Sequence, residues 1–227
     1  MKPPISRLLD LLLLPCIFLF LTYCSGEDRP LPPHLHPDEK ALQAALDRFV
    51  AIYRKGSKQA VGSGLLLNSS GQILSCLHIV KMHSVPLAAS RNARDFSDLR
   101  VIKRAPKRDL VLFASDLKRE LPPLGFRSSD SLVVGESVYA FGAPWGLSRS
   151  YLQGYIAHQG RNGIDQKLPG LRLIQTMGLS YPGTSGAGIY DAQGRLIGLN
   201  RATYGFVVGN GIGFAVPSST LQAFLDQ

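Results

Sequence analysis

Three residues of the types that hydrolases use for nucleophilic catalysis occur along the chain in the order His78, Asp109, Ser185. Cleaving an amide bond with a serine requires a base that takes the hydroxyl proton and returns it to the leaving amine. It also requires a carboxylate that fixes the tautomer of that base. In this pattern Ser185 would be the nucleophile, His78 the proton carrier and Asp109 the group that holds the imidazole. Each residue is weak evidence by itself, and the order of all three carries the hypothesis.

The segment around the serine, Pro182-Gly183-Thr184-Ser185-Gly186, has the composition of a tight turn. Negative charge that develops on the substrate oxygen must be met by backbone N–H groups, so the chain has to turn sharply and approach the substrate closely. Glycine permits both. We therefore expect an oxyanion hole formed by the backbone of Gly183, Thr184 and Ser185, with the N–H groups of Gly183 and Ser185 as its donors.

Two other hydrolase arrangements do not fit the sequence. The nucleophile elbow requires Gly-x-Ser-x-Gly, but Ala187 stands at the position of its last glycine, and that fold orders its triad differently. The metallopeptidase pattern His-Glu-x-x-His does not occur, and His34 and His36 lie in a proline-rich stretch. We expect no metal site and no cofactor.

The first two dozen residues have the composition of a secretion signal. Lys2 and Arg7 precede an apolar run at 11–21, which is shorter than the roughly 20 residues of a membrane span. The residues Leu21-Thr22-Tyr23-Cys24 resemble the box at which bacterial lipoproteins are lipidated on the cysteine, although Tyr23 stands where a small residue is usual. Residues 1–24 are predicted to be a signal peptide. Lipidation of Cys24, simple cleavage and an uncleaved anchor remain three alternatives.

The cysteine count limits the covalent chemistry of the exported part. Of the three cysteines, Cys16 and Cys24 lie in the predicted signal, which leaves Cys76 as the only ordinary thiol. No intrachain disulfide is then possible, so the core has to stabilise the fold. Cys76 is interpreted as a small buried hydrophobic residue rather than as a nucleophile.

The formal net charge of the chain is +9. Much of this charge lies in one region: Arg100, Lys103, Arg104, Lys107, Arg108, Lys118 and Arg119. Such a region could attract anionic lipid or nucleic acid, but no aromatic side chains or base-reading motif accompany it. We interpret it as a solvated basic face and predict no nucleic-acid partner.

The remaining chain indicates an all-β domain with a helix at each end. Residues 25–37 are polar and proline-rich, as in a tether, and a helix with Asp38 as its cap is expected to follow. Short β-prone runs then alternate with turns, as in a sandwich or barrel. These runs are 62–67, 72–75, 85–88, 99–103, 110–113, 137–141, 151–157, 171–175, 188–190, 195–199 and 211–216. Glycine-containing hairpin turns are expected at 68–71 and 191–194, and a final helix at 218–225, capped by serine.

Many of these segments together resemble the trypsin-like serine peptidases of the bacterial HtrA/Deg type, over roughly residues 49–225. The matching blocks follow the order of that family: 62–64, 75–80, 108–111, 135–138, 142–147, 174–176, 182–186, 194–200 and 213–218. The resemblance implies two perpendicular antiparallel β-barrels, the first at about 49–118 and the second at about 130–217, within a peptidase domain at 38–227. It also implies a helix at 39–48, a first strand at 49–54, and a triad of His78, Asp109 and Ser185 in the cleft between the barrels.

The same resemblance suggests where a substrate binds. Digestive trypsins carry an acidic residue six positions before the serine, and Leu179 stands there. Preference for a small aliphatic side chain rather than for arginine or lysine is therefore expected. Leu179 and the stretch Asn200, Arg201, Ala202 and Thr203 are expected to form the substrate pocket.

The resemblance implies an exported serine endopeptidase that acts on unfolded polypeptides, either in the bacterial periplasm or held to the membrane by a lipid anchor. The sequence as given ends just after the protease core, so we expect no peptide-sensing PDZ module. Relatives of this type often form trimers, but no segment of the sequence identifies an oligomer interface. Thr184, Ala187 and Met177 depart from the family around the serine loop. A catalytically inactive, protease-fold binding or chaperone-like envelope protein is therefore the alternative.

The signal-peptide hypothesis predicts the N-terminus of the mature protein. Mass spectrometry of the protein isolated from its native envelope should find a lipidated Cys24 or an N-terminus close to it, because the apolar run ends there. An intact Met1 in that fraction would contradict the prediction.

Overall fold

The computed structural model describes residues 37–83, 85–166, 168–203 and 211–227. The predicted signal peptide, Cys24 and nearly all of the tether lie outside these residues. Among the residues described, no helix is both long enough and apolar enough to cross a bilayer.

The domain begins with helix α2 (Glu39–Arg48) and passes directly into strand β1 (Phe49–Arg54). The Asp38 carboxylate accepts a hydrogen bond of 2.6 Å from the Ala41 N–H, which confirms the predicted helix cap. At the other end of the helix, the buried Arg48 guanidinium donates to the carbonyl oxygens of Leu66 and Leu67. These contacts fix the helix against the first sheet before β1 begins.

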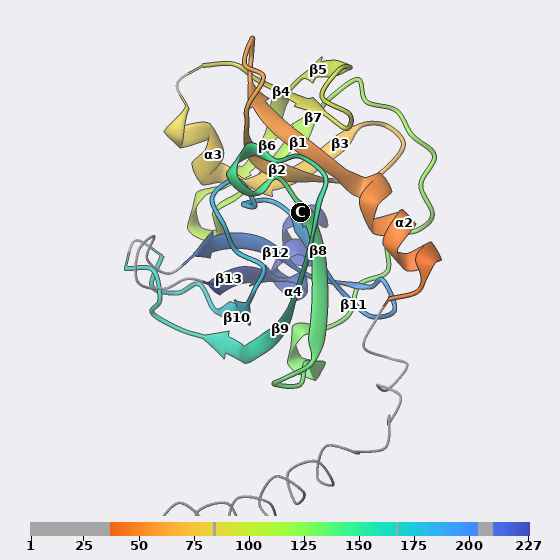
Figure 1. Ribbon diagram of the computed structural model, residues 1–227. Helices are drawn as coiled ribbons and strands as arrows, with labels where there is room; N and C mark the ends of the chain where they lie inside the picture. The colour runs from red at the N-terminus through yellow and green to blue at the C-terminus, as the bar shows by residue number, and fades with distance from the viewer. Residues whose placement is uncertain (1–36, 84, 167, 204–210) are drawn as a thin grey trace, which may run out of the picture. The chain divides into compact units, whose positions relative to one another are not determined.

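The first half of the chain forms a seven-stranded antiparallel sheet in the order β5-β4-β1-β2-β3-β7-β6 (Figure 1). Its other strands are β2 (Ala60–Leu66), β3 (Gln72–Cys76), β4 (Leu87–Ser90), β5 (Phe96–Asp98), β6 (Arg100–Ala105) and β7 (Leu110–Ala114). The short helix α3 (Leu77–Met82) follows β3, and the single 3₁₀ turn η2 (Pro106–Arg108) precedes β7. The predicted turn at 68–71 is confirmed, with Gly71 at a φ of +86°.

The second half closes into a six-stranded antiparallel barrel in the order β10-β13-β12-β11-β8-β9. Its strands are β8 (Ser137–Gly142), β9 (Ser150–Arg161), β10 (Leu173–Met177), β11 (Gly188–Asp191), β12 (Leu196–Thr203) and β13 (Ile212–Pro217). Two 3₁₀ turns, η3 (Ser129–Ser131) and η4 (Pro144–Gly146), flank β8, and helix α4 (Ser218–Leu225) ends the domain. The predicted all-β fold with a helix at each end is confirmed.

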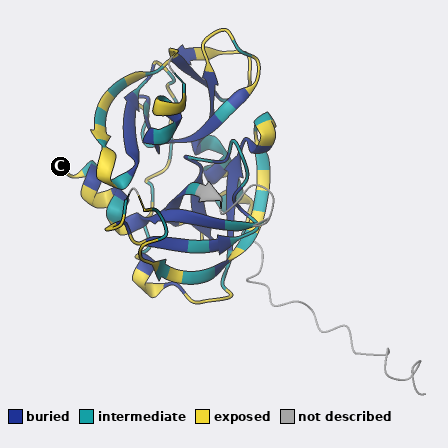
Figure 2. Cartoon of the chain, turned by 90° about the vertical axis from the view of Figure 1, so that its left-hand side faces the viewer, coloured by how far each residue is buried: buried dark blue, intermediate teal, exposed yellow. Residues whose placement is uncertain are grey.

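The core joins the two sheets. Dark, buried segments run through the strands of both (Figure 2). One cluster of buried apolar side chains combines first-sheet residues such as Ile52 and Leu74 with Phe141, Leu173 and Phe214 of the barrel. A smaller cluster fills the barrel itself. Because one core crosses the junction, the position of each sheet is fixed relative to the other.

Three local predictions differ from the structure. Strand β5 was not expected, because three residues, Phe96–Asp98, are too few to show alternation. Helix α3 was not expected either, since six residues give little helical periodicity. The predicted serine cap of α4 is wrong: no side chain caps the helix, and the Ser218 hydroxyl instead donates to the Arg127 carbonyl at 2.6 Å.

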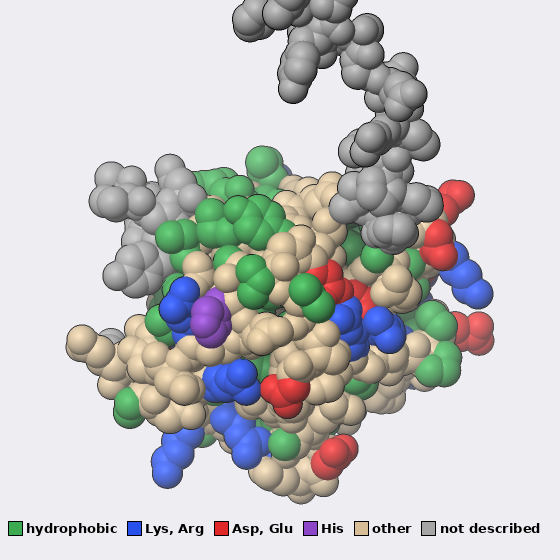
Figure 3. Space-filling view, turned by 90° about the horizontal axis from the view of Figure 1, so that it is seen from below, with side chains coloured by type: hydrophobic (Ala, Val, Ile, Leu, Met, Phe, Trp, Pro, Cys, Tyr) green, Lys and Arg blue, Asp and Glu red, His purple; other side chains and the backbone are tan. Residues whose placement is uncertain are grey.

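Several members of the basic region have structural partners. Lys103 donates to the Phe224 carbonyl at 2.5 Å and lies 4.8 Å from the centre of the Phe224 ring, which holds α4 against β6. Arg119 pairs with Asp47 at 2.5 Å. On the face of the molecule seen in Figure 3, basic and acidic side chains are interspersed. The contacts of Lys103 and Arg119 show that these two members of the basic region hold neighbouring parts of the domain together.

Candidate active site

The pairing of β3 with β7 brings His78 and Asp109 together. In this antiparallel pair Cys76 lies opposite Leu110, so the residues that follow β3 meet the residue that precedes β7. The His78 Nδ1 lies 2.7 Å from Asp109 Oδ2, and the His78 backbone N–H donates to Asp109 Oδ1 at 2.8 Å. Both carboxylate oxygens therefore orient the histidine, one through its ring and one through its backbone.

Asp109 occupies an unusual backbone conformation directly after η2. Its φ of 56° and ψ of 37° lie in the left-handed region, which aspartate tolerates better than most residues. The side chain is almost fully buried. Burial alone would raise the pKa of Asp109, but the hydrogen bond from His78 and the charges of His78 and Arg201 outweigh it, so the pKa lies below its ordinary value.

Ser185 lies in the loop between β10 and β11, and this loop is held against β2 of the first sheet. The Ser63 N–H donates to the Ser185 carbonyl at 2.8 Å, and the Ser63 hydroxyl donates to the Gly183 carbonyl at 2.8 Å. The same hydroxyl accepts from the Ala143 N–H at 3.1 Å. Ser63 of the first sheet thus binds two carbonyls of the serine loop (Ser185 and Gly183) and the N–H of Ala143 in the neighbouring loop.

This contact requires glycine at two positions of the serine loop. Gly186 has a φ of +88°, and a Cβ there would lie 2.0 Å from the Ser63 carbonyl oxygen. Gly183 has a φ of +94°, and its Cβ would lie 2.1 Å from the Ala143 carbonyl oxygen. The loop can adopt this conformation and come this close only because both side chains are absent.

The two predicted donors of the oxyanion hole are available, whereas the Thr184 N–H is not. Thr184 donates its N–H to the Tyr181 carbonyl at 3.0 Å. In the described part of the chain, the N–H groups of Gly183 and Ser185 donate to no other group. The backbone of this loop can therefore offer two N–H groups to a developing oxyanion, from Gly183 and Ser185.

The Ser185 hydroxyl points to a different acceptor from the one that the triad requires. It donates to the Arg201 carbonyl at 2.9 Å, and no hydrogen bond joins it to His78 among the described residues. Both residues nevertheless line the same pocket. Catalytic hydrogen bonds are often absent without substrate, and a serine hydroxyl turns between acceptors by a single side-chain rotation.

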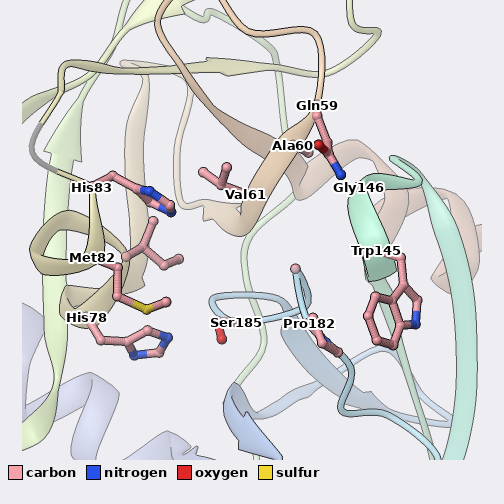
Figure 4. Close-up of a pocket in the computed structure, with 12 residues that line it drawn as sticks. Gln59, Ala60, Val61, His78, Met82, His83, Trp145, Gly146, Pro182 and Ser185 are labelled. Carbon is pink, nitrogen blue, oxygen red and sulfur yellow. The ribbon is translucent and has the colours of Figure 1, made fainter. Parts of the chain in front are cut away.

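Figure 4 shows the pocket that His78 and Ser185 share. Its volume is about 360 Å³. One wall comes from α3 with His78 and Met82, and the other comes from η4 with Trp145. Met82 and Trp145 are exposed over 71% and 56% of their surface. The rim of the pocket is therefore apolar on both sides.

The predicted substrate-binding residues differ in their burial and in their hydrogen-bond partners. Leu179 is completely buried in the core of the barrel. Asn200 is also buried, and its amide donates to the Leu179 carbonyl and to Thr184 Oγ1, at 3.1 and 2.7 Å. Arg201 is half-buried and binds the Asp109 carboxylate. Ala202 and Thr203 belong to β12, and their side chains lie outside what the structure describes.

Ligand-type atoms of Cys76, His78 and Asp109 lie within 4.8 Å of one another, but their chemistry does not suit a metal. Burial and the nearby Asp109 charge raise the pKa of the Cys76 thiol well above its ordinary value, so it stays neutral. Asp109 Oδ2 is already shared between His78 Nδ1 and the Arg201 guanidinium, whose charge opposes a cation. The full burial of Cys76 confirms its interpretation as a hydrophobic residue.

Two contributors to the site were not anticipated as such. In the sequence, Ser63 stands out only as the middle of a Gly-Ser-Gly pattern. In the structure, a Cβ on Gly62 would lie 2.6 Å from Ile79 Cδ1, and one on Gly64 would lie 2.7 Å from Ile73 Cγ2. Glycine at these two positions therefore leaves room for the isoleucine side chains, while Ser63 between them binds the serine loop. The second contributor that was not anticipated is Arg201, through its contact with Asp109. The available signal was an arginine within a central strand, next to Asn200 on the opposite face, because a charged side chain in such a position usually has a partner.

Residues 62–199 match the family of trypsin-like peptidase domains, a span that includes His78, Asp109 and Ser185 and more than half of the chain. The chain belongs to this family. Among curated trypsin-like peptidases, it is 31% identical over 170 residues to the periplasmic serine endoprotease DegP of Salmonella typhimurium, covering 74% of this chain and 35% of that protein. It is 31% identical over 182 residues to the serine protease HTRA1 of Xenopus tropicalis, covering 79% of this chain and 38% of that protein.

Solved structures agree with this assignment. The HtrA-type protease AlgW with tripeptide is similar with a TM-score of 0.72 and 26% identity, over 82% of this chain and 61% of that one. These findings confirm the resemblance to peptidases of the HtrA/Deg type. The chain spans a little over a third of the length of the curated relatives it matches.

The contact between the serine loop and β2 predicts a difference between two glycine substitutions. Gly186 and Gly135 both have a φ of +88°, but a Cβ on Gly135 meets nothing within 4 Å. Alanine at either position incurs roughly 1–2 kcal/mol of backbone strain, and only Gly186→Ala adds a clash with the Ser63 carbonyl. In thermal unfolding, Gly186→Ala should lower the Tm by about 4 °C or more beyond Gly135→Ala. Equal losses would show that the loop is not pressed against β2.

Proposed function

We propose that this chain is an exported serine endopeptidase that hydrolyses peptide bonds of unfolded polypeptides through an acyl-enzyme on Ser185. The observation that carries the proposal is the hydrogen bond of 2.7 Å between His78 Nδ1 and Asp109 Oδ2, beside a pocket that His78 shares with Ser185. With Nδ1 held by the carboxylate, the proton of the neutral imidazole resides there and Nε2 is left as the basic nitrogen.

In the first step, the Ser185 hydroxyl turns from the Arg201 carbonyl toward His78 Nε2 and attacks the carbonyl carbon of the substrate. The Oγ–C bond forms as the hydroxyl proton passes to Nε2, and the carbonyl electrons move onto oxygen. The N–H groups of Gly183 and Ser185 stabilise that oxyanion. Asp109, which is buried and ionised, stabilises the resulting imidazolium.

In the following steps, the imidazolium returns its proton to the leaving nitrogen as the C–N bond breaks, which leaves the acyl group on Ser185. Water then attacks the ester with His78 again as base, and the Ser185 oxygen recovers its proton when the acid departs. The proposed cycle uses only these protein groups and water, and no cofactor takes part in it.

The pocket favours an apolar, unfolded substrate. Met82 and Trp145 expose apolar surface on opposite rims, and an unfolded polypeptide presents the apolar side chains that could cover them. Leu179 is uncharged and buried, so it offers no partner to a basic side chain, in line with the proposed preference for small aliphatic residues. AlgW, the structural neighbour, was solved with a tripeptide.

We further propose a location in the bacterial envelope. The curated relatives DegP and DegQ are periplasmic serine endoproteases by name, and the N-terminal segment has the composition of a signal peptide. A lipid on Cys24 would hold the domain at the membrane through the proline-rich tether.

One observation favours the alternative of an inactive, protease-fold binding protein. The Ser185 hydroxyl is bonded to the Arg201 carbonyl rather than to His78. If this hydrogen bond persisted with a polypeptide in the pocket, the serine would not be activated, and the chain would bind its partner without cleaving it.

Casein digestion by the purified mature protein distinguishes these two functions. Ser185→Ala should lower kcat by something on the order of 10⁶, and His78→Ala should cost about as much, because the triad works as a unit. Combining the two substitutions should add little. Equal activity of the parent protein and Ser185→Ala would reject the nucleophile, and casein binding without cleavage by the parent protein would favour the alternative.

A further inference from the structure

The side chain of Arg201 lies between two aspartates beside the candidate triad. Its Nε donates to Asp109 Oδ2 at 2.8 Å, and its Nη2 donates to Asp165 Oδ2 at 2.5 Å. The Arg201 side chain is only 11% exposed. An arginine side chain that is this little exposed and bound by two carboxylates has a fixed position, because moving it to solvent would leave both carboxylates without their cation.

The carboxylate oxygen that Arg201 binds is the one that His78 binds. Asp109 Oδ2 accepts from the His78 ring at 2.7 Å and from Arg201 at 2.8 Å, while Oδ1 accepts from the His78 backbone. A carboxylate oxygen has two acceptor sites, so both donors can bind it together. The positive charge of Arg201 is therefore held close to the imidazole, through one shared atom.

We propose that Arg201 is a positioning residue of the catalytic site. It fixes the Asp109 carboxylate, and its charge keeps His78 in the neutral, basic form down to a lower pH than in a site without that charge. This inference rests on the proposed peptidase function. It differs from the expected contact of Arg201 with substrate, because the guanidinium is turned toward Asp109 and Asp165 rather than offered to a ligand.

The sign of the effect follows from electrostatics. The serine can be deprotonated only by a neutral imidazole, and protonation of His78 places a second positive charge beside Arg201. Repulsion disfavours that state. With Arg201 in place, activity should therefore survive to lower pH, and without its charge the acidic limb of the pH profile should move to higher pH.

Other ionisable groups around His78 do not replace this effect. The buried Cys76 thiol is neutral because its pKa is raised. His83, at the end of α3, lines the same pocket; burial and the nearby Arg54 lower its pKa. Asp109 carries the negative charge that favours the imidazolium, and Arg201, itself partly neutralised by Asp165, is the cation that binds Asp109 directly.

The test compares pH profiles of kcat/KM for casein digestion at constant ionic strength. Arg201→Gln keeps an N–H donor for Asp109 but removes the charge, and should move the acidic midpoint upward by roughly half a pH unit to one unit. Arg201→Lys, which retains the charge, should keep the acidic midpoint close to that of the parent protein. Arg172→Gln is the control: it removes an exposed arginine paired with Asp130 and leaves Asp109 untouched, so its midpoint should equal that of the parent protein.

An unchanged midpoint in Arg201→Gln would overturn the proposal, whatever the change in kcat. A rise of KM alone would also overturn it, because it would assign Arg201 to substrate binding. An equal shift in Arg172→Gln would overturn it as well. NMR titration of the His78 imidazole in the Ser185→Ala background gives the same comparison without turnover. If the parent protein with Ser185 intact cleaves no casein, a shift in this titration would uphold the role of Arg201 and reject only the peptidase function.

Discussion

The site depends on the contact between the serine loop and strand β2. His78 and Asp109 belong to the first sheet and Ser185 to the barrel, so the groups meet only if the two sheets keep a fixed distance. Ser63 supplies that constraint through an N–H bonded to the Ser185 carbonyl and a hydroxyl bonded to the Gly183 carbonyl. The absence of a side chain at Gly186 lets the loop reach β2, and the common core holds the junction closed around it.

Charge is the second constraint, because the site buries a carboxylate. An ionised group without partners is costly to bury, and Asp109 has three donors on its two oxygens. Asp165, Arg201, Asp109 and His78 thus form a row in which formal charges alternate when the imidazole is protonated. The row connects the β9–β10 loop, which carries Asp165, to His78.

The sequence predicted those features that depend on short, local patterns. Helix α2 with its Asp38 cap and most of the strands follow from periodicity and turn residues. Strand β1 follows from the resemblance to the peptidase family, and the closeness of His78 to Asp109 follows from the order of the three candidate catalytic residues. Elements of three to six residues, β5 and α3, are too short to produce a pattern. The contacts of Ser63 and Arg201 join residues far apart in the chain, so only the packed structure reveals which carbonyl or carboxylate each one meets.

The central claim is that Ser185 is a nucleophile activated by His78, and covalent labelling tests it most directly. A fluorophosphonate probe reacts with an activated serine and adds a defined mass to it. Peptide mapping of the labelled protein should place the whole modification on Ser185, and His78→Ala should abolish it. Absence of labelling in the folded parent protein, or a modification on another serine, would contradict the account.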